Sequence, residues 1–130
     1  MSGSHAAATF DAKAFLDAYR NSFARGPAAI ASFYAEPCVT ARSGLVKVNP
    51  SRADTIAVFS EVDKQYRARG FTHADYHLLV ARDLGANAAL ATARWAYKSA
   101  DEQVIWRTVF TYNLYRMAEG WKILLQTMHD

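Results

Sequence analysis

The spacing of apolar residues changes character about halfway along the chain. Up to residue 70 it follows the turn of a helix, and Phe15, Tyr19 and Phe23 form an aromatic stripe at every fourth position. From residue 71 onward the chain has long apolar or alternating runs separated by short polar connections, which is typical of strands. Helices followed by strands predict an α+β fold whose helices cover one face of a curved sheet.

Three helices are predicted in the first half of the chain. The first is capped by Thr9 and stops at Gly26, a residue type that commonly ends helices. The second is short, covers residues 27–34 and ends before Pro37, because a residue that precedes proline is pushed out of the helical region. The third helix covers residues 50–70 and ends at a glycine.

The strands begin with a short hairpin at residues 38–42 and 45–48, which turns at a Ser-Gly pair. The connections that follow are short enough for antiparallel hairpins, so we expect an antiparallel sheet. Four longer strands are predicted, at residues 71–82, 88–98, 103–116 and 121–129.

Composition indicates one globular domain. Of the 130 residues, 52% are hydrophobic and 21% are charged, which is the balance of a folded domain rather than a disordered chain. We assign residues 9–130 to that domain and residues 1–8 to a flexible tail. The single cysteine, Cys38, excludes an internal disulfide and favours a reducing compartment, so the cytoplasm is the expected location.

Charge and hydropathy remove two classes of partner. The net charge is +3, but the basic residues are spread from Lys13 to Lys122 rather than clustered as nucleic-acid binding requires. No run reaches the ~18 apolar residues of a membrane span. We therefore expect neither a nucleic acid nor a membrane as a partner.

The strand at residues 103–116 is apolar on both faces in places. Val104, Ile105 and Trp106 follow one another, and Val109 and Phe110 do the same. One face meets the helices, and the other needs cover as well. A homodimer through the outer face of the sheet would supply that cover.

Two loose motifs carry a family resemblance. A helix-turn-helix passes from Phe15-Leu16-Asp17-Ala18-Tyr19 to Ser32-Phe33-Tyr34-Ala35, and the chain closes on Gly120-Trp121-Lys122-Ile123. With the order of the elements, the chain resembles the nuclear transport factor 2-like superfamily, in particular its small SnoaL-like bacterial domains. The resemblance implies a cone-like fold, in which a strongly curved antiparallel sheet wraps around three N-terminal helices.

The resemblance also implies a set of chemistries that need particular side chains. The ketosteroid isomerases of this superfamily use a basic aspartate on the strand after the second helix, where this chain has Thr40 and Arg42. The epoxide hydrolases pair aspartates with an arginine, but neither Arg94 nor Arg107 has an acidic residue two positions away. The scytalone dehydratases combine tyrosines, an aspartate and paired histidines. Tyr19 with Asp17 nearby, and the pair of His73 and His77, preserve a distant echo of that set.

The candidate acid–base group is His73, Asp75 and His77, which share one face of a predicted strand. Asp75 could orient an imidazole that moves a proton, while Tyr19 polarises a carbonyl. Simpler interpretations are a solvated strand face for the histidines and a core position for Tyr19. The three residues could also begin a metal site, but they provide too few ligands for us to expect one.

A second set of residues suits a pocket for a ring or an acyl chain, since it is mostly aromatic with a few polar groups. Stacking within the core or in a dimer interface would explain the aromatic members equally well. The candidate ligand-binding residues are Phe15, Phe33, Arg42, Phe59, Trp95, Trp106, Tyr112 and Gln126.

Two functions follow from these patterns. The first is a cofactor-independent isomerase, cyclase or dehydratase that acts by acid–base chemistry on a hydrophobic carbonyl or polyketide-like substrate. The alternative is a non-catalytic domain that binds a hydrophobic ligand or dimerises, and the absence of the carboxylates used by the superfamily favours it.

Overall fold

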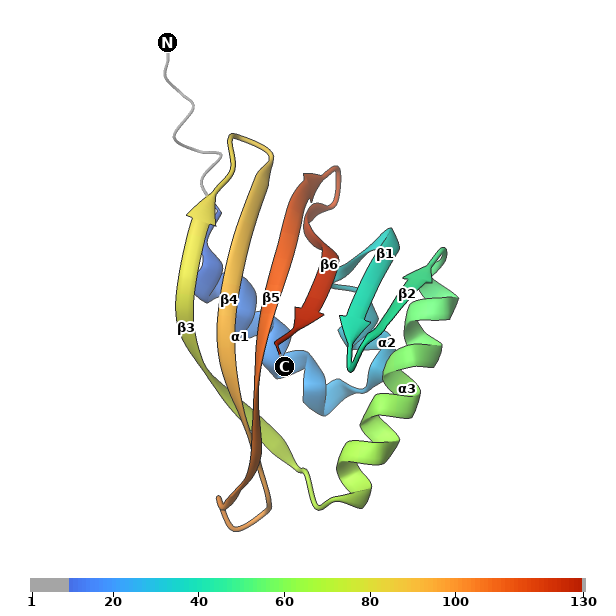
Figure 1. Ribbon diagram of the computed structural model, residues 1–130, viewed down its shortest axis with the longest axis vertical. Coiled ribbons are helices and arrows are strands. Elements are labelled where there is room, and N and C mark those ends of the chain that lie inside the picture. The colour runs from blue at the N-terminus through green and yellow to red at the C-terminus, as the bar shows by residue number, and fades with distance from the viewer. Residues whose placement is uncertain (1–9, 130) are drawn as a thin grey trace.

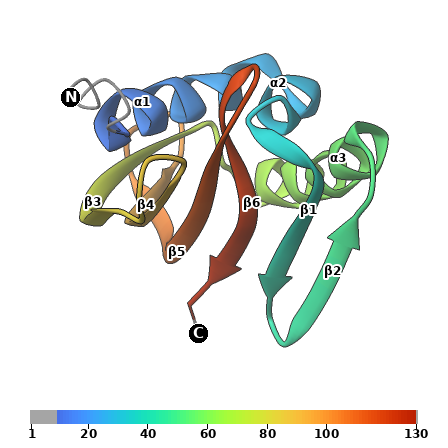
Figure 2. The ribbon, with the colours of Figure 1, turned by 90° about the horizontal axis from the view of Figure 1, so that it is seen from above.

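The computed structural model describes residues 10–129, so the predicted tail at residues 1–8 and the predicted cap Thr9 lie outside the described residues. The helices gather on one side of a single curved sheet (Figures 1 and 2). The helical elements are α1 (Ala12–Ser22), the 3-10 turn η2 (Phe23–Arg25), α2 (Pro27–Ala31) and α3 (Arg52–Ala68). The strands are β1 (Tyr34–Arg42), β2 (Leu45–Asn49), β3 (His73–Asp83), β4 (Ala88–Lys98), β5 (Val104–Met117) and β6 (Gly120–Met128).

Helix α1 begins later than the sequence pattern suggested. Its cap is Asp11, whose carboxylate accepts a hydrogen bond from the backbone N–H of Ala14 at 3.0 Å. The chain leaves the following 3-10 turn through Gly26, whose φ of 97° is a conformation that glycine adopts without strain. The predicted stop at Gly26 is therefore present, with one turn of 3-10 helix in front of it.

Helix α2 is shorter than predicted, and Tyr34 belongs to a strand instead of a helix. The helix ends at Ala31, and Tyr34 already pairs with Ile123 of β6. The side chain of Tyr34 is 1% exposed, so it is held in the core by packing between layers. Local helical spacing was overridden there by tertiary contacts.

Helix α3 has a strong start. Ser51 and Asp54 form a capping box, in which each side chain accepts a hydrogen bond from the backbone N–H of the other residue. Thr55 and Phe59 are buried on its inner side, and the helix packs against α2 and β1. This packing places the inner side of α3 over one end of the sheet.

The six strands form one sheet in the order β2-β1-β6-β5-β4-β3. Every pair of neighbouring strands is antiparallel as predicted except β1 and β6, which run parallel. Between these two strands in the sequence, α3 connects β2 at one edge of the sheet with β3 at the other edge. Register shifts interrupt four of the ladders, and such bulges bend strands. The result is the strongly curved α+β cone that the pattern and the resemblance predicted (Figure 2).

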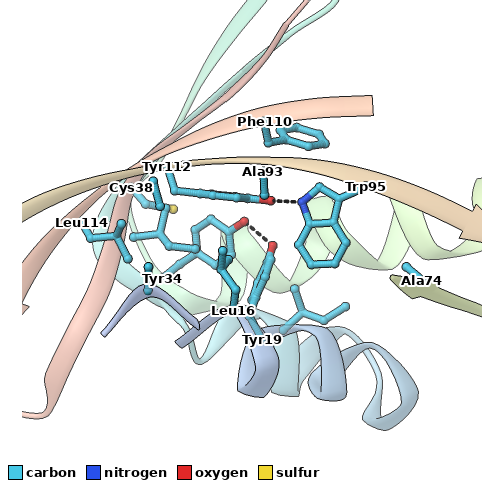
Figure 3. Packing of buried hydrophobic residues seen from close by; sticks show 14 of the residues in the cluster. Leu16, Tyr19, Tyr34, Cys38, Ala74, Ala93, Trp95, Phe110, Tyr112 and Leu114 are labelled. Atoms are coloured by element: carbon cyan, nitrogen blue, oxygen red, sulfur yellow. Dashed lines mark hydrogen bonds between the residues drawn. The ribbon is translucent and has the colours of Figure 1, made fainter. Parts of the chain in front are cut away.

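The core lies between the concave face of the sheet and the helices, and it is rich in aromatic rings (Figure 3). Strand β4 alternates along most of its length, with Thr92 buried on the outer face as an exception, and its other buried residues face the helices. Ala91 and Ala93 lie in register beside Tyr112 and Phe110 of β5, so small side chains alternate with large rings across the sheet. No helix within residues 10–129 is long and apolar enough to span a membrane.

Candidate ligand cavity

A cavity of about 50 Å³ lies between the concave face of the sheet and the inner sides of α1 and α3. Most of its wall is aromatic, and three side chains add stronger polarity: Arg42, Asp63 and Gln126. Walls of this kind, with few polar groups, are typical of small-molecule sites, but this cavity is several times smaller than the ~300–1,000 Å³ that such sites usually offer. The principal aromatic residues of the wall are Tyr19, Phe59, Tyr66, Tyr97, Phe110 and Tyr112.

A chain of three polar groups lies at the buried end of the cavity, with Tyr19 and Gln126 in the wall and Tyr34 behind it. The hydroxyl oxygens of Tyr19 and Tyr34 are 2.5 Å apart, and the amide nitrogen of Gln126 donates to Tyr34 Oη at 2.9 Å. Figure 3 shows the two tyrosines meeting between α1 and β1. Burial raises the pKa of both phenols well above the usual value, so both stay neutral and can donate hydrogen bonds.

Gln126 has an unused hydrogen-bonding atom at this end. Its side chain is 3% exposed, and its Oε1 has no hydrogen-bond partner among residues 10–129. Exchanging the amide oxygen and nitrogen would leave the nitrogen unpaired instead, so one polar atom remains free in either orientation. A buried polar atom without a partner is costly, and a ligand or a water molecule in the cavity would satisfy it.

Tyr112 offers a second free group next to Gln126. Its hydroxyl accepts a hydrogen bond from the indole N–H of Trp95 at 3.0 Å, which leaves its own proton available (Figure 3). Burial raises the pKa of Tyr112 well above the usual value, so this group is also a neutral donor. The buried end therefore suits a neutral oxygen function such as a carbonyl or a hydroxyl.

The other end of the cavity is more accessible to solvent and carries charge. Arg42, at the end of β1, donates from Nη2 to Tyr66 Oη at 3.0 Å, and both side chains are half-buried. Asp63 of α3 also lines the cavity, but its carboxylate accepts two hydrogen bonds from Nε of Arg67 at 3.1 and 3.3 Å. Of the described residues that line the cavity, Asp63 provides the single carboxylate.

The predicted acid–base group lies elsewhere. His73, Asp75 and His77 are on the face of β3 that points away from the helices, because the alternate residues Ala74 and Tyr76 fill the inner face. The structure therefore does not bring the three residues to Tyr19 or to the cavity, contrary to the expected arrangement.

Each of the first two members has partners outside the group. His73 Nε2 lies 3.0 Å from Glu102 Oε2, and Asp75 accepts from Lys98 Nζ at 2.9 Å. The hydrogen bond from Lys98 lowers the pKa of Asp75, so this carboxylate stays ionised. Asp75 is therefore bound to a lysine instead of orienting an imidazole.

The predicted ligand-binding residues divide into two groups. Four of them line the cavity together with Tyr19: Arg42, Phe59, Tyr112 and Gln126. The others are aromatic residues that pack elsewhere. Trp95 is in the core against Tyr19 and Phe23, with ring centroids 6.1 and 5.3 Å apart.

Phe15, Phe33 and Trp106 are also outside the cavity. Phe15 and Phe33 line an open hollow on the surface near Trp121, where their rings meet edge to face at 5.6 Å. Trp106 stacks on Tyr97 at 4.8 Å and lies under the guanidinium of Arg69. These rings support the ends of the sheet and the helix layer.

Sequence reasoning did not select Tyr34, Asp63 and Tyr66 for the site. Asp63 lies four residues after Phe59, and Tyr66 lies three residues after Asp63, so all three share one side of a helix. Helical spacing could therefore have identified Asp63 and Tyr66 once Phe59 was selected. Tyr34 could not be found this way, since its position depends on the unexpected parallel pairing with β6. Among residues 10–129 the structure contains no cluster of side chains suited to a metal ion.

The sequence of the chain also matches the model of a known protein family. The chain belongs to the family described as NTF2-like protein (DUF6841), whose model matches residues 10–130. No curated protein shows a significant sequence match to this chain.

Solved structures of the same fold cover almost the whole chain. An NTF-2-like protein of unknown function from Shewanella oneidensis MR-1 is 19% identical, with a TM-score of 0.72 over 92% of this chain and 96% of its own. A domain of unknown function with a cystatin-like fold from Nostoc punctiforme PCC 73102 is 14% identical, with a TM-score of 0.72 over 90% and 73%. A ketosteroid isomerase-like protein from Erwinia carotovora atroseptica SCRI1043 is 15% identical, with a TM-score of 0.65 over 89% and 90%.

Proposed function

We propose that this protein binds a hydrophobic small molecule in the aromatic cavity, with an oxygen function of the ligand at the buried end. The observation that carries the proposal is the amide of Gln126, which is buried beside the cavity with one polar atom unpaired. The neutral phenols of Tyr19 and Tyr112 stand near it as donors. A carbonyl or hydroxyl group on a ring would meet these groups, and because the cavity is smaller than a ring compound, the aromatic wall would have to open for the carbon skeleton to enter.

Binding alone is the function that the cavity supports best. The tyrosines stay neutral because their pKa values are raised, so they can donate protons in hydrogen bonds but cannot act as bases near neutral pH. Thr40 of β1 is buried in register with Gln126, in the part of the strand where a ketosteroid isomerase would carry its aspartate. A non-catalytic binding domain needs no such base.

The test is a thermal shift screen against cyclic ketones, ring compounds and acyl chains, followed by calorimetry on any compound that stabilises the protein. A ligand at 100 times its dissociation constant adds about 2.7 kcal/mol to stability, which raises the melting temperature by several degrees. We expect Gln126→Leu to weaken the binding of a carbonyl ligand about fivefold, because the net value of one hydrogen bond is about 1 kcal/mol.

The matched control is His77→Gln, a substitution on the outer face of β3 that should leave the affinity unchanged. If no compound stabilises the wild-type protein, the cavity does not bind a ligand and the proposal fails. It also fails if Gln126→Leu binds every ligand as tightly as His77→Gln does.

A second candidate is proton transfer on the bound carbonyl, which Asp63 favours because it lines the same cavity as Tyr19. Tyr19 would polarise the carbonyl by donating a hydrogen bond to its oxygen. The Asp63 carboxylate would take a proton from the carbon next to that carbonyl and return it to another carbon of the same ligand. This assignment replaces the histidines of β3 with Asp63 as the base. With this assignment, the two residues that an isomerase-type reaction would need, Tyr19 and Asp63, line the same cavity.

The assembly that we propose is a homodimer through the outer face of the sheet. Val48, Val39 and Leu125 lie side by side across β2, β1 and β6, and Val48 is 60% exposed. Val46 on the same strand is 68% exposed, so the apolar row continues to the edge. The row carries no charge, and a second copy of the same face would complement it.

A further inference from the structure

We propose that the ligand is an organic acid whose carboxylate binds Arg42 at the open end of the cavity, while a neutral oxygen function occupies the buried end. The inference rests on the proposed binding function and specifies the chemical class of the ligand. It is carried by an arginine that the protein holds in place without neutralising its charge.

Two aromatic residues fix the guanidinium of Arg42. Its Nη2 donates to Tyr66 Oη at 3.0 Å, and its Cζ lies 5.7 Å from the centroid of the Phe110 ring. The second contact is a cation–π interaction, which favours a cation over the face of the ring. Together they direct the guanidinium along the cavity wall before any ligand arrives.

Most of the hydrogen-bonding capacity of Arg42 is unused. A guanidinium has five N–H groups, and within residues 10–129 the bond to Tyr66 is the one side-chain hydrogen bond that Arg42 donates. No carboxylate of the same residues forms an ion pair with it. A half-buried guanidinium has already lost part of its hydration, and an anionic ligand would supply the counter-ion that these residues do not.

The acidic residue that could compete for Arg42 has another partner. Asp63 lines the same end of the cavity, but Arg67 binds both of its carboxylate oxygens from the next turn of α3. The pair of Asp63 and Arg67 is neutral as a unit, which leaves Arg42 as an uncompensated positive charge at the opening. An arginine is well suited to a carboxylate because two parallel N–H groups can bind its two oxygens.

The buried end has the opposite preference. Tyr19, Tyr112 and Gln126 are neutral there, and a second carboxylate would lose its hydration without gaining a cation. The two ends together select a molecule with a carboxylate at one end, an apolar middle and a hydroxyl or ketone at the other. Hydroxyaryl carboxylic acids and keto acids with a ring have this arrangement.

The experiment compares acids with their uncharged amides. The probes are 4-hydroxybenzoate, 4-hydroxyphenylacetate and 4-hydroxycinnamate, each with its primary amide, titrated into the full chain by calorimetry at pH 7. We expect at least one acid to bind about 10- to 100-fold more tightly than its amide, which is the usual value of charge-assisted hydrogen bonds. Added salt should weaken the binding of the acid and leave the affinity of the amide unchanged.

Variants assign the preference to Arg42. Arg42→Gln should bring the affinity of the acid down to that of the amide, while the amide binds as to the wild type. Tyr66→Phe keeps the ring and removes the acceptor that orients the guanidinium, so the acid should weaken severalfold. The matched control is Arg94→Gln, which removes an exposed arginine from the outer face of β4 and should change neither affinity.

The outcomes separate this inference from the function on which it rests. If cyclic ketones bind but no acid binds more tightly than its amide, the cavity binds ligands and the role of Arg42 is wrong. An acid preference that survives Arg42→Gln, with the variant melting as the wild type does, also overturns the inference. If neither these probes nor the ketones bind, the proposed function itself fails.

Discussion

At the scale of single residues, the division of roles between Tyr19 and Asp63 decides whether the cavity is catalytic. A neutral phenol and a carboxylate line the same small space. If the protein turns a carbonyl ligand over, Asp63→Asn should lower the rate at least about 100-fold, because general base catalysis contributes that much or more. The affinity should change only a few-fold, since the amide keeps the shape of the carboxylate.

The rate is measured by following the ultraviolet absorbance of an unsaturated ketone, and the affinity by calorimetry. Asp75→Asn is the matched control, because that carboxylate is bound to Lys98 on the outer face of β3. Equal turnover by Asp63→Asn and the wild type would exclude Asp63 as the base. If the wild type turns over none of the compounds that it binds, the second candidate is excluded.

Residue by residue, alternation along strands predicts which side chains share a face but not what covers that face. His73, Asp75 and His77 share one face as expected, and the apolar neighbours Tyr76 and Leu78 take the inner one. The greater apolar character of that opposite face was visible in the sequence. It pointed to the outer placement that the structure has.

At the scale of elements, the capping box stabilises the first turn of α3, the helix that carries Phe59, Asp63 and Tyr66 to the cavity. We expect Ser51→Ala to lower the free energy of unfolding by about 1 kcal/mol, because it removes a side-chain cap from the first turn. The measurement is urea unfolding followed by circular dichroism. Ser60→Ala, at an exposed position within the same helix, is the matched control and should stay near the wild type.

A loss in Ser51→Ala no larger than that in Ser60→Ala would show that the capping box contributes nothing to stability. The starts and ends of such elements were largely predictable, because glycine, proline and cap residues act locally. The exceptions are the start of α1, which Asp11 caps two residues later than predicted, and the α2–β1 junction, where Tyr34 leaves the helical pattern to pair with β6. A contact between residues 34 and 123 has no local signal, so no reading of nearby residues could place it.

At the scale of the whole molecule, the order of helices and sheet was predictable from the change in period, whereas the cavity was only partly so. Arg42 and Gln126 come from strands distant in sequence, and β1 and β6 bring them to one space. Trp95 and Trp106 were expected there on the same grounds, but their rings pack in the core and at an end of the sheet. Aromatic content alone does not distinguish residues that line a cavity from residues that fill the core.

The exposed apolar row on β2 makes a prediction for assembly. Val48→Lys introduces a charge where two copies would meet, so we expect it to convert a dimer into a monomer at micromolar concentration, as measured by equilibrium sedimentation. The matched control is Lys47→Ala, since Lys47 is adjacent on the strand and its side chain points to the other face. A wild-type protein that is already monomeric under these conditions contradicts the proposed dimer.

The row of alanines on β4 has a consequence for how this fold diversifies. Ala91 and Ala93 do not touch the cavity, yet each lies beside a ring that does, Tyr112 and Phe110 respectively. Enlarging either methyl group would push the neighbouring ring sideways and reshape the space without altering any residue that contacts the occupant. Under the proposed function, ligand preference would therefore change with substitutions at positions one layer behind the wall, and a comparison restricted to contact residues would not detect them.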